Sequence, residues 1–403
     1  MSAQRGERRR VRAFLALLAG LVVVDIGLSL VVGRDGLLLG LPLPPFGAVT
    51  EPKQRAWIEE LRVEPKGIGA FEAELGWSVR PNAVSADGKA RTNSIGARGT
   101  REYALAKPAG VTRLVCVGDS YTWGDEVADA DTFEAQLEDA CRDVECINLG
   151  VAAYGTDQAL LRWKRVGERL QPDVLVVGLL LENIGRNVNR YRPLWYPGSG
   201  SAPAKPRFVL GGRVPGSATH VEPERGASSA TMAELVLVPQ PFATGPELAC
   251  AIEDASVIAR LREHERWSWS STWWSVSSLA RCTAAVISDR ERDVERLWSD
   301  EAGEPFQVTL ALLRAFRAPR VIVVVFPREV DLDSLADGDR PYWSGLLAAL
   351  DQAGIEHVDV APELARARAD HQRDPSRPRP YAGGHLSRAG NAIVVEALRA
   401  RLK

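Results

Sequence analysis

RLVCVGDSYTWG, at residues 113–124, is the stretch that decides the fold. Residues 114–117 form a short apolar run, which is typical of a strand buried on both faces. The run stops at Gly-Asp-Ser, so Ser120 lies where a strand ends. If a helix follows, the Ser120 hydroxyl lies beside free main-chain N–H groups, where a serine can attack a carbonyl and the oxyanion can be held. Gly-Asp-Ser is also a common turn sequence without any catalytic role. Features later in the chain therefore have to distinguish a turn from a nucleophilic serine.

Strands and helices alternate in the chain that follows. Helical patterns with apolar residues every three or four positions separate further expected strands at residues 144–149, 173–180, 320–326 and 356–360. This order predicts right-handed crossovers and a parallel sheet. We therefore expect an α/β fold of about five parallel strands, with the chemistry at the carboxyl ends of the strands.

The composition is that of an ordinary globular protein. The 403 residues are 45% hydrophobic and 25% charged, and the formal net charge of -2 offers no footprint for nucleic acid. Walker-type and GxGxxG fingerprints are absent, which disfavours a nucleotide-binding flavodoxin-like protein. The five cysteines show no zinc-site spacing, so we expect no structural zinc site. We also expect no other metal and no cofactor.

The N-terminus has the pattern of a membrane anchor. Residues 13–32 form an apolar segment about one bilayer long, interrupted by Asp25, and five arginines precede it. The arginines place the N-terminus in the cytoplasm and the rest of the chain outside it. Because no small-residue cleavage motif follows, we expect an uncleaved single-pass anchor in the inner membrane rather than a signal peptide. In an oxidising compartment, Cys141 could pair with Cys146 and Cys250 with Cys282, while Cys116 is expected to lie buried in its strand.

We divide the chain into an anchor (residues 1–34), a spacer and N-terminal extension (35–110) and an α/β domain (111–403) with an insert at about 188–318. The insert is first rich in Gly, Pro and Ser and then helical and rich in tryptophan. Its tryptophans form either the core of a helical insert or a platform for sugar rings or lipid. They are Trp267, Trp269, Trp273, Trp274 and Trp298.

A serine nucleophile needs a base within hydrogen-bond reach. Of the five histidines, only His385 lies in a loop just before a helix that returns to the sheet end carrying Ser120. A capping or surface role for His385 is the alternative.

Taken in chain order, the Gly-Asp-Ser turn, the ends of the following strands and the loop with His385 resemble the motifs of the SGNH (GDSL-type) hydrolase superfamily over residues 112–403. The resemblance implies Ser120 as nucleophile, His385 as general base, and an oxyanion hole made by the N–H groups of Ser120 and Gly150 and by the side chain of Asn183. It also implies a flavodoxin-like three-layer α/β/α sandwich.

Two positions depart from the family pattern. Glu182-Asn183 stands where Asn-Asp is usual, and the aspartate expected two or three residues before the histidine is replaced by Gly383 and Ala382. Either an acid of the preceding loop or a backbone carbonyl orients His385, or the enzyme works as a Ser-His dyad. The residues we expect in supporting roles are Asp119, Glu182, Asp370 and Asp374.

The sequence before Ser120 and the run ENIGRNVNRYRPLWYP at residues 182–197 resemble those of membrane-anchored bacterial members of this superfamily with a long insert. We expect an extracytoplasmic, membrane-anchored serine esterase that removes acyl groups from O-acylated cell-envelope polysaccharide or from a small ester. The alternatives are an O-acyltransferase that acts on an exopolysaccharide and a non-catalytic glycan-binding protein.

Overall fold

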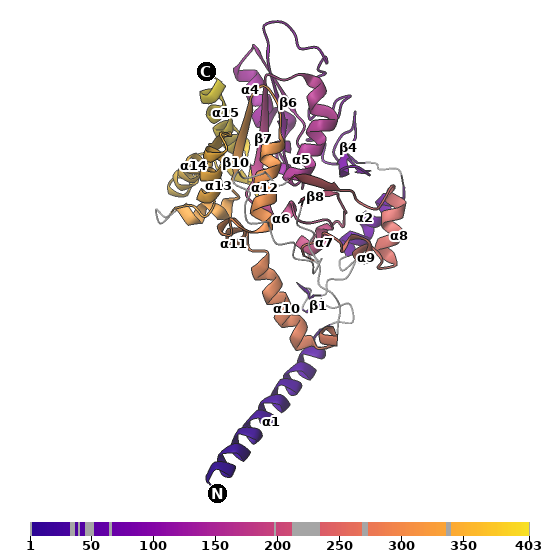
Figure 1. Ribbon diagram of the computed structural model, residues 1–403. Helices are drawn as coiled ribbons and strands as arrows, with labels where there is room; N and C mark the ends of the chain where they lie inside the picture. Colours follow the sequence, from indigo (N-terminus) through magenta and orange to yellow (C-terminus); the bar gives the residue numbers. More distant parts are fainter. Residues whose placement is uncertain are drawn as a thin grey trace, which may run out of the picture.

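A five-stranded parallel sheet forms the centre of the computed structural model (Figure 1). The structure describes residues 2–32, 37–38, 41–44, 52–63, 67–196, 199–211, 234–267, 273–335 and 340–402. The sheet contains β5 (Thr112–Val117), β6 (Val144–Asn148), β7 (Val174–Leu180), β10 (Val321–Phe326) and β11 (Glu356–Asp359). All five expected strands are present, which confirms the predicted α/β fold.

The spatial order of the strands is β6-β5-β7-β10-β11, and every neighbouring pair is parallel. The chain leaves β5 toward β6 on one side and returns to β7 on the other, which is the flavodoxin-like, doubly wound order. The direction in which successive strands are added to the sheet therefore reverses at β5. Ligands in such sheets bind beside the carboxyl ends of the strands at this switch point.

Helices cover both faces of the sheet and complete the three layers. On one face α15 (Arg388–Leu402) packs against α4 (Phe133–Ala140) and α14 (Ala361–Arg373). On the other face α12 (Glu304–Ala315) packs against α5 (Thr156–Arg162) and α13 (Ser344–Gln352). Every residue of β7 is buried, because the sheet is covered from both sides.

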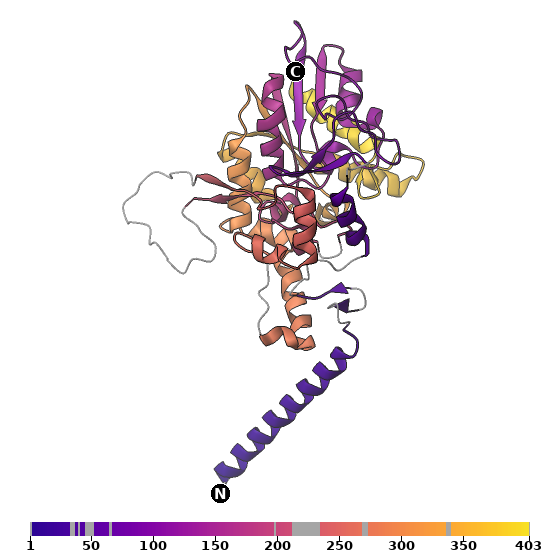
Figure 2. The same cartoon turned by 90° about the vertical axis from the view of Figure 1, so that its right-hand side faces the viewer.

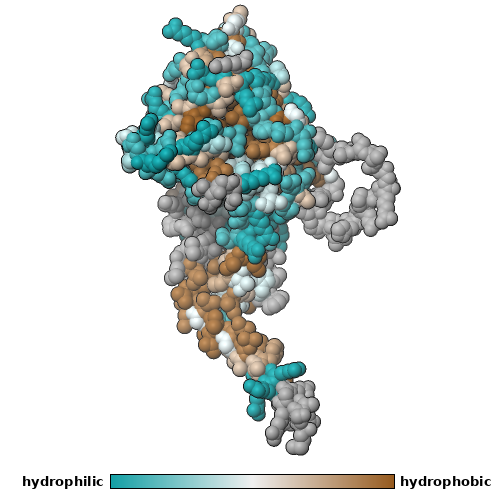
Figure 3. Space-filling view, turned by 90° about the vertical axis from the view of Figure 1, so that its left-hand side faces the viewer, coloured by the Kyte–Doolittle hydropathy of each residue, from teal (hydrophilic) through white to brown (hydrophobic). Residues whose placement is uncertain are grey.

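The apolar N-terminal segment forms a single long helix, α1 (Ser2–Ser29), which extends away from the domain (Figure 2). Its stretch Arg9–Ser29 is long and apolar enough to cross a bilayer, as a membrane anchor or a signal sequence would be, and none of it is buried. Figure 3 shows this helix as an apolar stalk. Asp25 accepts hydrogen bonds from Leu279 N (2.7 Å) and Ser277 Oγ (2.9 Å), so it caps the helix α10 (Ser278–Glu291) of the insert.

The N-terminal extension packs beside the sheet. It contains α2 (Pro52–Arg62) and an antiparallel pair, β3 (Gly69–Glu72) with β4 (Gly76–Val79). The short pair β1 (Leu37–Leu38) and β2 (Leu41–Pro42) precedes it, and most of the expected spacer lies outside the described residues.

The insert between β7 and β10 is mixed rather than purely helical. It contains the antiparallel pair β8 (Arg207–Leu210) and β9 (Leu235–Val238), followed by short helices. These are α8 (Gly245–Glu253), α9 (Val257–Leu261), η4 (Trp273–Val276), α10 and α11 (Val294–Ser299).

Trp267 and Trp298 are buried in this insert, and Trp298 Nε1 donates to Leu181 O at 2.8 Å, just after β7. Both therefore serve as core residues, one of the two roles expected for the insert tryptophans. Trp269 lies outside the described residues.

The five cysteines are all free thiols, so neither expected disulfide is present. Cys146 lies on β6, and its Sγ is 3.6 Å from the Sγ of Cys116 on the neighbouring strand β5. Cys141 instead ends α4 and is half-buried. The two cysteines that are close in sequence thus belong to different layers.

Candidate active site

Ser120 opens a single helical turn, α3 (Ser120–Trp123), directly after β5. Asp119 caps this turn, because its Oδ1 accepts a hydrogen bond from Tyr121 N at 2.8 Å. Ser120 is 5% exposed. The strand therefore delivers the serine to the carboxyl edge of the sheet, and the cap fixes the direction of the turn.

The tight geometry at this strand end requires glycine. A Cβ on Gly118 would stand 2.9 Å from Gly178 O, and it would also collide with the side chain of Thr122. Thr122 fills the space between β5 and β7 that these two glycines leave free. Gly118 thus lets α3 pack closely on the central strands.

His385 reaches Ser120 from a small hairpin. The strands β12 (Tyr381–Ala382) and β13 (His385–Leu386) pair, and His385 Nε2 lies 3.0 Å from Ser120 Oγ. The Tyr121 hydroxyl donates to Gly384 O at 2.9 Å, and its ring centroid lies 5.3 Å from that of His385. The hairpin is thereby fastened to the helical turn that carries the serine.

The environment of His385 favours its neutral form. Burial lowers the pKa of the imidazole, against the opposing effect of the carboxylates of Asp119, Glu126 and Glu182. A neutral Nε2 can accept the serine proton. His385 Nδ1 is buried and has no hydrogen-bond partner among the described residues.

The two acids expected from the loop before the hairpin do not reach His385. Asp370 forms an ion pair with Arg373 at 2.5 Å, and Asp374 accepts from Ser376 N at 3.1 Å. Both are exposed. Asp370 lies in the last turn of α14 and Asp374 caps that helix, which directs them to solvent.

Asp125 is a site residue that the sequence analysis missed. Its Oδ2 lies 3.8 Å from His385 Nε2, on the same side of the ring as Ser120. Burial raises the pKa of Asp125 to about 6, with a further contribution from Glu126, against the effect of Arg98 and Arg186. The only sequence signal was its position just after the serine block.

Asn183 begins α6 (Asn183–Arg186), at the end of β7. Its Nδ2 donates to Asp119 Oδ2 at 2.8 Å, and the side chain is buried. A primary amide carries two N–H hydrogens, so one remains for another acceptor. The strand order therefore brings Asn183 and Ser120 to the same edge of the sheet.

Gly150 is the second residue whose N–H we expected in the oxyanion hole. Its N–H already donates to Asn148 Oδ1 at 2.9 Å, and Gly150 is not among the residues that line the Ser120 cavity. Ala153, from the same loop, does line this cavity and has a positive φ of 66°. Within the described chain, the main-chain N–H groups of Ala153 and Ser120 have no acceptor. These two N–H groups are therefore candidate donors to an oxyanion at the serine.

The cavity at Ser120 has a volume of about 490 Å³. Its walls carry both charged and apolar residues: Asp125, Ala152, Ala153, Leu180, Glu182, Arg186, Arg192, Tyr196, Arg328, Glu329, Val330 and His385. Glu182 accepts from Arg186 Nη2 at 3.0 Å and also from the Tyr196 hydroxyl. It therefore shapes the wall of the cavity, and among the described residues it forms no hydrogen bond or ion pair with His385.

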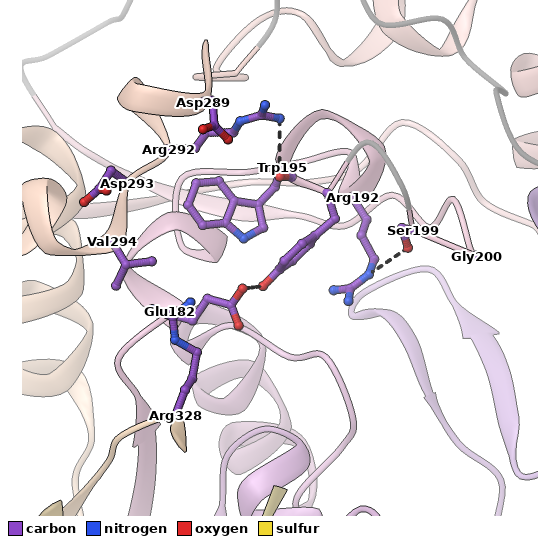
Figure 4. Close-up of a pocket in the computed structure, with 11 residues that line it drawn as sticks. Glu182, Arg192, Trp195, Ser199, Gly200, Asp289, Arg292, Asp293, Val294 and Arg328 are labelled. Carbon is purple, nitrogen blue, oxygen red and sulfur yellow. Dashed lines mark hydrogen bonds between the residues drawn. The ribbon is translucent and has the colours of Figure 1, made fainter. Parts of the chain in front are cut away.

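A second cavity of about 670 Å³ adjoins the first and shares Glu182, Arg192, Tyr196 and Arg328 with it (Figure 4). Burial and the neighbouring Arg186 together lower the pKa of Arg192 to about 9, against the opposing effect of Glu182. The guanidinium of Arg192 lies 4.5 Å from the ring centroid of Tyr196. The space beside the serine thus continues into a large polar cavity.

No protein-family model matches the chain. No curated protein matches it either. Solved structures similar to it include a member of the lipolytic G-D-S-L family from Veillonella parvula (11% identity, TM-score 0.31, covering 72% of this chain and 97% of that one). An acetyl xylan esterase from Geobacillus stearothermophilus is similar at 10% identity and a TM-score of 0.34, covering 74% and 97% of the two chains. A gut microbial diltiazem-metabolizing enzyme is similar at 11% identity and a TM-score of 0.35 over 73% of this chain, which spans 48% of that protein's length.

Proposed function

We propose that the chain is a serine ester hydrolase that removes acyl groups. The observation that carries this proposal is the 3.0 Å contact between Ser120 Oγ and His385 Nε2 at the carboxyl end of a parallel sheet. Free main-chain N–H groups and a buried amide lie close by, and a cavity opens on the serine. This combination is what acyl transfer through a serine requires.

In the proposed mechanism, Ser120 Oγ attacks the ester carbonyl carbon while His385 Nε2 takes the hydroxyl proton. The oxyanion is held by the N–H groups of Ser120 and Ala153 and by the second amide hydrogen of Asn183. The tetrahedral intermediate then collapses, and His385 returns the proton to the departing alcohol. Water attacks the acyl-serine with His385 again acting as base, which releases the acid and restores the serine.

We propose an acylated glycan of the cell envelope as the substrate. The polar cavity beside the serine suits a leaving group with many hydroxyls. The α1 helix supports a membrane-anchored enzyme whose domain lies outside the cytoplasm, with the N-terminal arginines on the inner side. We propose neither a cofactor nor a nucleic-acid partner.

One observation favours a second activity, transfer of the acyl group to a sugar hydroxyl. Two cavities meet at Glu182, Arg192, Tyr196 and Arg328, so an acceptor sugar has room beside the acyl-serine. Hydrolysis and transfer share the acyl-enzyme and differ only in whether water or sugar attacks it.

The test is hydrolysis of acetylated polysaccharides by the full-length chain in detergent, with released acetate as the readout and Ser120→Ala as the control. Acetate release that depends on Ser120 supports the proposal. Acyl transfer to an added oligosaccharide, with little free acetate, favours the second activity. Glycan binding that survives in Ser120→Ala, without turnover by the parent, indicates a non-catalytic binding protein.

A further inference from the structure

The ring nitrogen of His385 that faces away from Ser120 has no partner among the described residues. His385 Nδ1 is buried and has no hydrogen bond among the described residues. A general base of this kind normally has its second ring nitrogen held by a carboxylate, which fixes the tautomer and stabilises the imidazolium. Ala382 pairs directly with His385 across the hairpin, so its side chain lies beside the ring but bears no carboxylate.

A carboxylate does lie at this hairpin, but it comes from a different part of the chain. A Cβ on Gly383 would stand 2.6 Å from Glu126 Cδ and 2.7 Å from Glu126 Oε1. The Glu126 carboxyl group therefore occupies the space that a side chain at position 383 would fill. Glu126 follows α3 by three residues, so the segment that carries the serine also brings this acid to the histidine hairpin.

The backbone at Glu126 is held in an unfavourable conformation. Its φ is +73°, in the left-handed region that non-glycine residues rarely adopt. Gly383 on the facing hairpin has a φ of +58° and leaves the space open. The Glu126 side chain is exposed and makes no hydrogen bond or ion pair within the described chain, so it is free to move toward the ring.

From this geometry we propose that Glu126 is the positioning residue of the catalytic histidine: its carboxylate accepts the Nδ1–H of His385 during the reaction. The proposal rests on the proposed esterase function. Glu126 thereby takes the place of the acid that is missing from positions 382 and 383. Catalytic hydrogen bonds are often long in ligand-free enzymes and shorten in the substrate complex.

The other charged groups around the ring do not serve this role. Asp125 lies 3.8 Å from Nε2, the nitrogen that faces Ser120, and not beside Nδ1. Asp119 is engaged by Tyr121 N and by Asn183 Nδ2. Glu182 is engaged by Arg186 and Tyr196.

The first experiment compares the full-length parent with Glu126→Gln and, as a matched control, Glu295→Gln, which changes an exposed residue on α11. The pH profile of kcat/KM on p-nitrophenyl acetate is measured. We expect Glu126→Gln to lower the plateau at least 10-fold. Loss of a nearby negative charge lowers the imidazolium pKa. The rising limb of the pH profile of Glu126→Gln should therefore also move to lower pH, by about 0.5 pH unit. Glu295→Gln should match the parent.

A rescue variant separates positioning from damage to the fold. In Glu126→Ala, the added change Ala382→Asp places a carboxylate directly across the hairpin from His385. We expect kcat/KM of this double variant to be at least 10-fold higher than that of Glu126→Ala alone. The proposal would be overturned if the pH profile of kcat/KM for Glu126→Gln had a plateau within twofold of the parent's and a rising limb at the same pH.

A measurement that needs no turnover keeps this proposal separate from the esterase function. NMR titration of 15N-labelled histidine, with the His385 signal identified by its loss in His385→Ala, reports the imidazole pKa directly. A lower His385 pKa in Glu126→Gln than in the parent supports the positioning role, and equal values contradict it. Failure of the esterase function would show instead as a parent chain without Ser120-dependent turnover.

Discussion

Asn183 donates an amide hydrogen to Asp119 Oδ2 across 2.8 Å, which ties the turn after β7 to the turn after β5. The same carboxylate caps α3 through its other oxygen. Asp119 thus fixes both the serine turn and the amide that we place in the oxyanion hole. Replacing this carboxylate changes both at once.

We predict that Asp119→Asn lowers kcat about 10- to 100-fold and lowers the free energy of unfolding by about 1–3 kcal/mol. The new amide can still cap α3 through its oxygen, but its NH2 group cannot accept from Asn183. Activity assays and urea unfolding check both effects. If kcat stays within twofold of the parent, Asn183 does not depend on Asp119 for its position.

Ala153 offers a test of the loop that supplies a free N–H. Its φ of +66° suits glycine and strains a β-branched residue. We predict that Ala153→Gly keeps activity and raises the free energy of unfolding by about 0.5–1 kcal/mol, whereas Ala153→Val lowers both. Thermal unfolding and kcat are measured for both variants. An active, stable Ala153→Val would show that this loop conformation is not needed.

Asp125 makes stability depend on pH. Burial raises its folded pKa to about 6, above the unfolded value of about 3.9. The folded state therefore keeps the proton longer than the unfolded state, so this stabilising contribution is full below about pH 4 and is lost as the pH rises through about 6. The side chain is 33% exposed, which reduces the effect to about 1–2 kcal/mol.

We predict that Asp125→Asn gains about 1–2 kcal/mol of stability relative to the parent between pH 4 and pH 8, because it removes this proton linkage. Urea unfolding of both proteins across that range is the measurement. Parallel stability curves would mean that the pKa of Asp125 does not differ between the folded and unfolded states.

The parallel sheet was predictable because its three central strands are rich in apolar residues and helical patterns separate the strands along the chain. The flavodoxin-like arrangement was implied by the family resemblance. Ser120 and His385 were placed together because strand ends and the final helix converge at one edge. The contacts of single polar groups were not predictable. Asn148 occupies the Gly150 N–H, and a helix cap and an ion pair direct Asp374 and Asp370 to solvent. These depend on side-chain geometry that spacing does not encode.

Arg98 connects the N-terminal extension to the site. Its side chain is 2% exposed, pairs with Asp129 at 3.0 Å and donates to the carbonyl oxygens of Trp123, Gly124 and Val127, each at 2.6 Å. We predict that Arg98→Met lowers the free energy of unfolding by about 3–5 kcal/mol, because it leaves buried acceptors unpaired. Urea unfolding tests this, with Arg91→Met, an exposed neighbour, as control. Equal midpoints for the two variants would contradict it.

The most direct test of the account is labelling of the full-length chain by a fluorophosphonate probe, compared with Ser120→Ala and His385→Ala. Circular dichroism shows that each protein is folded. We predict that the parent is labelled, that Ser120→Ala is not, and that His385→Ala is labelled at least 100-fold more slowly, because the base that activates the serine is missing. A folded parent that is not labelled, or a His385→Ala variant labelled at the parent's rate, would contradict the claim that Ser120 and His385 form a catalytic pair.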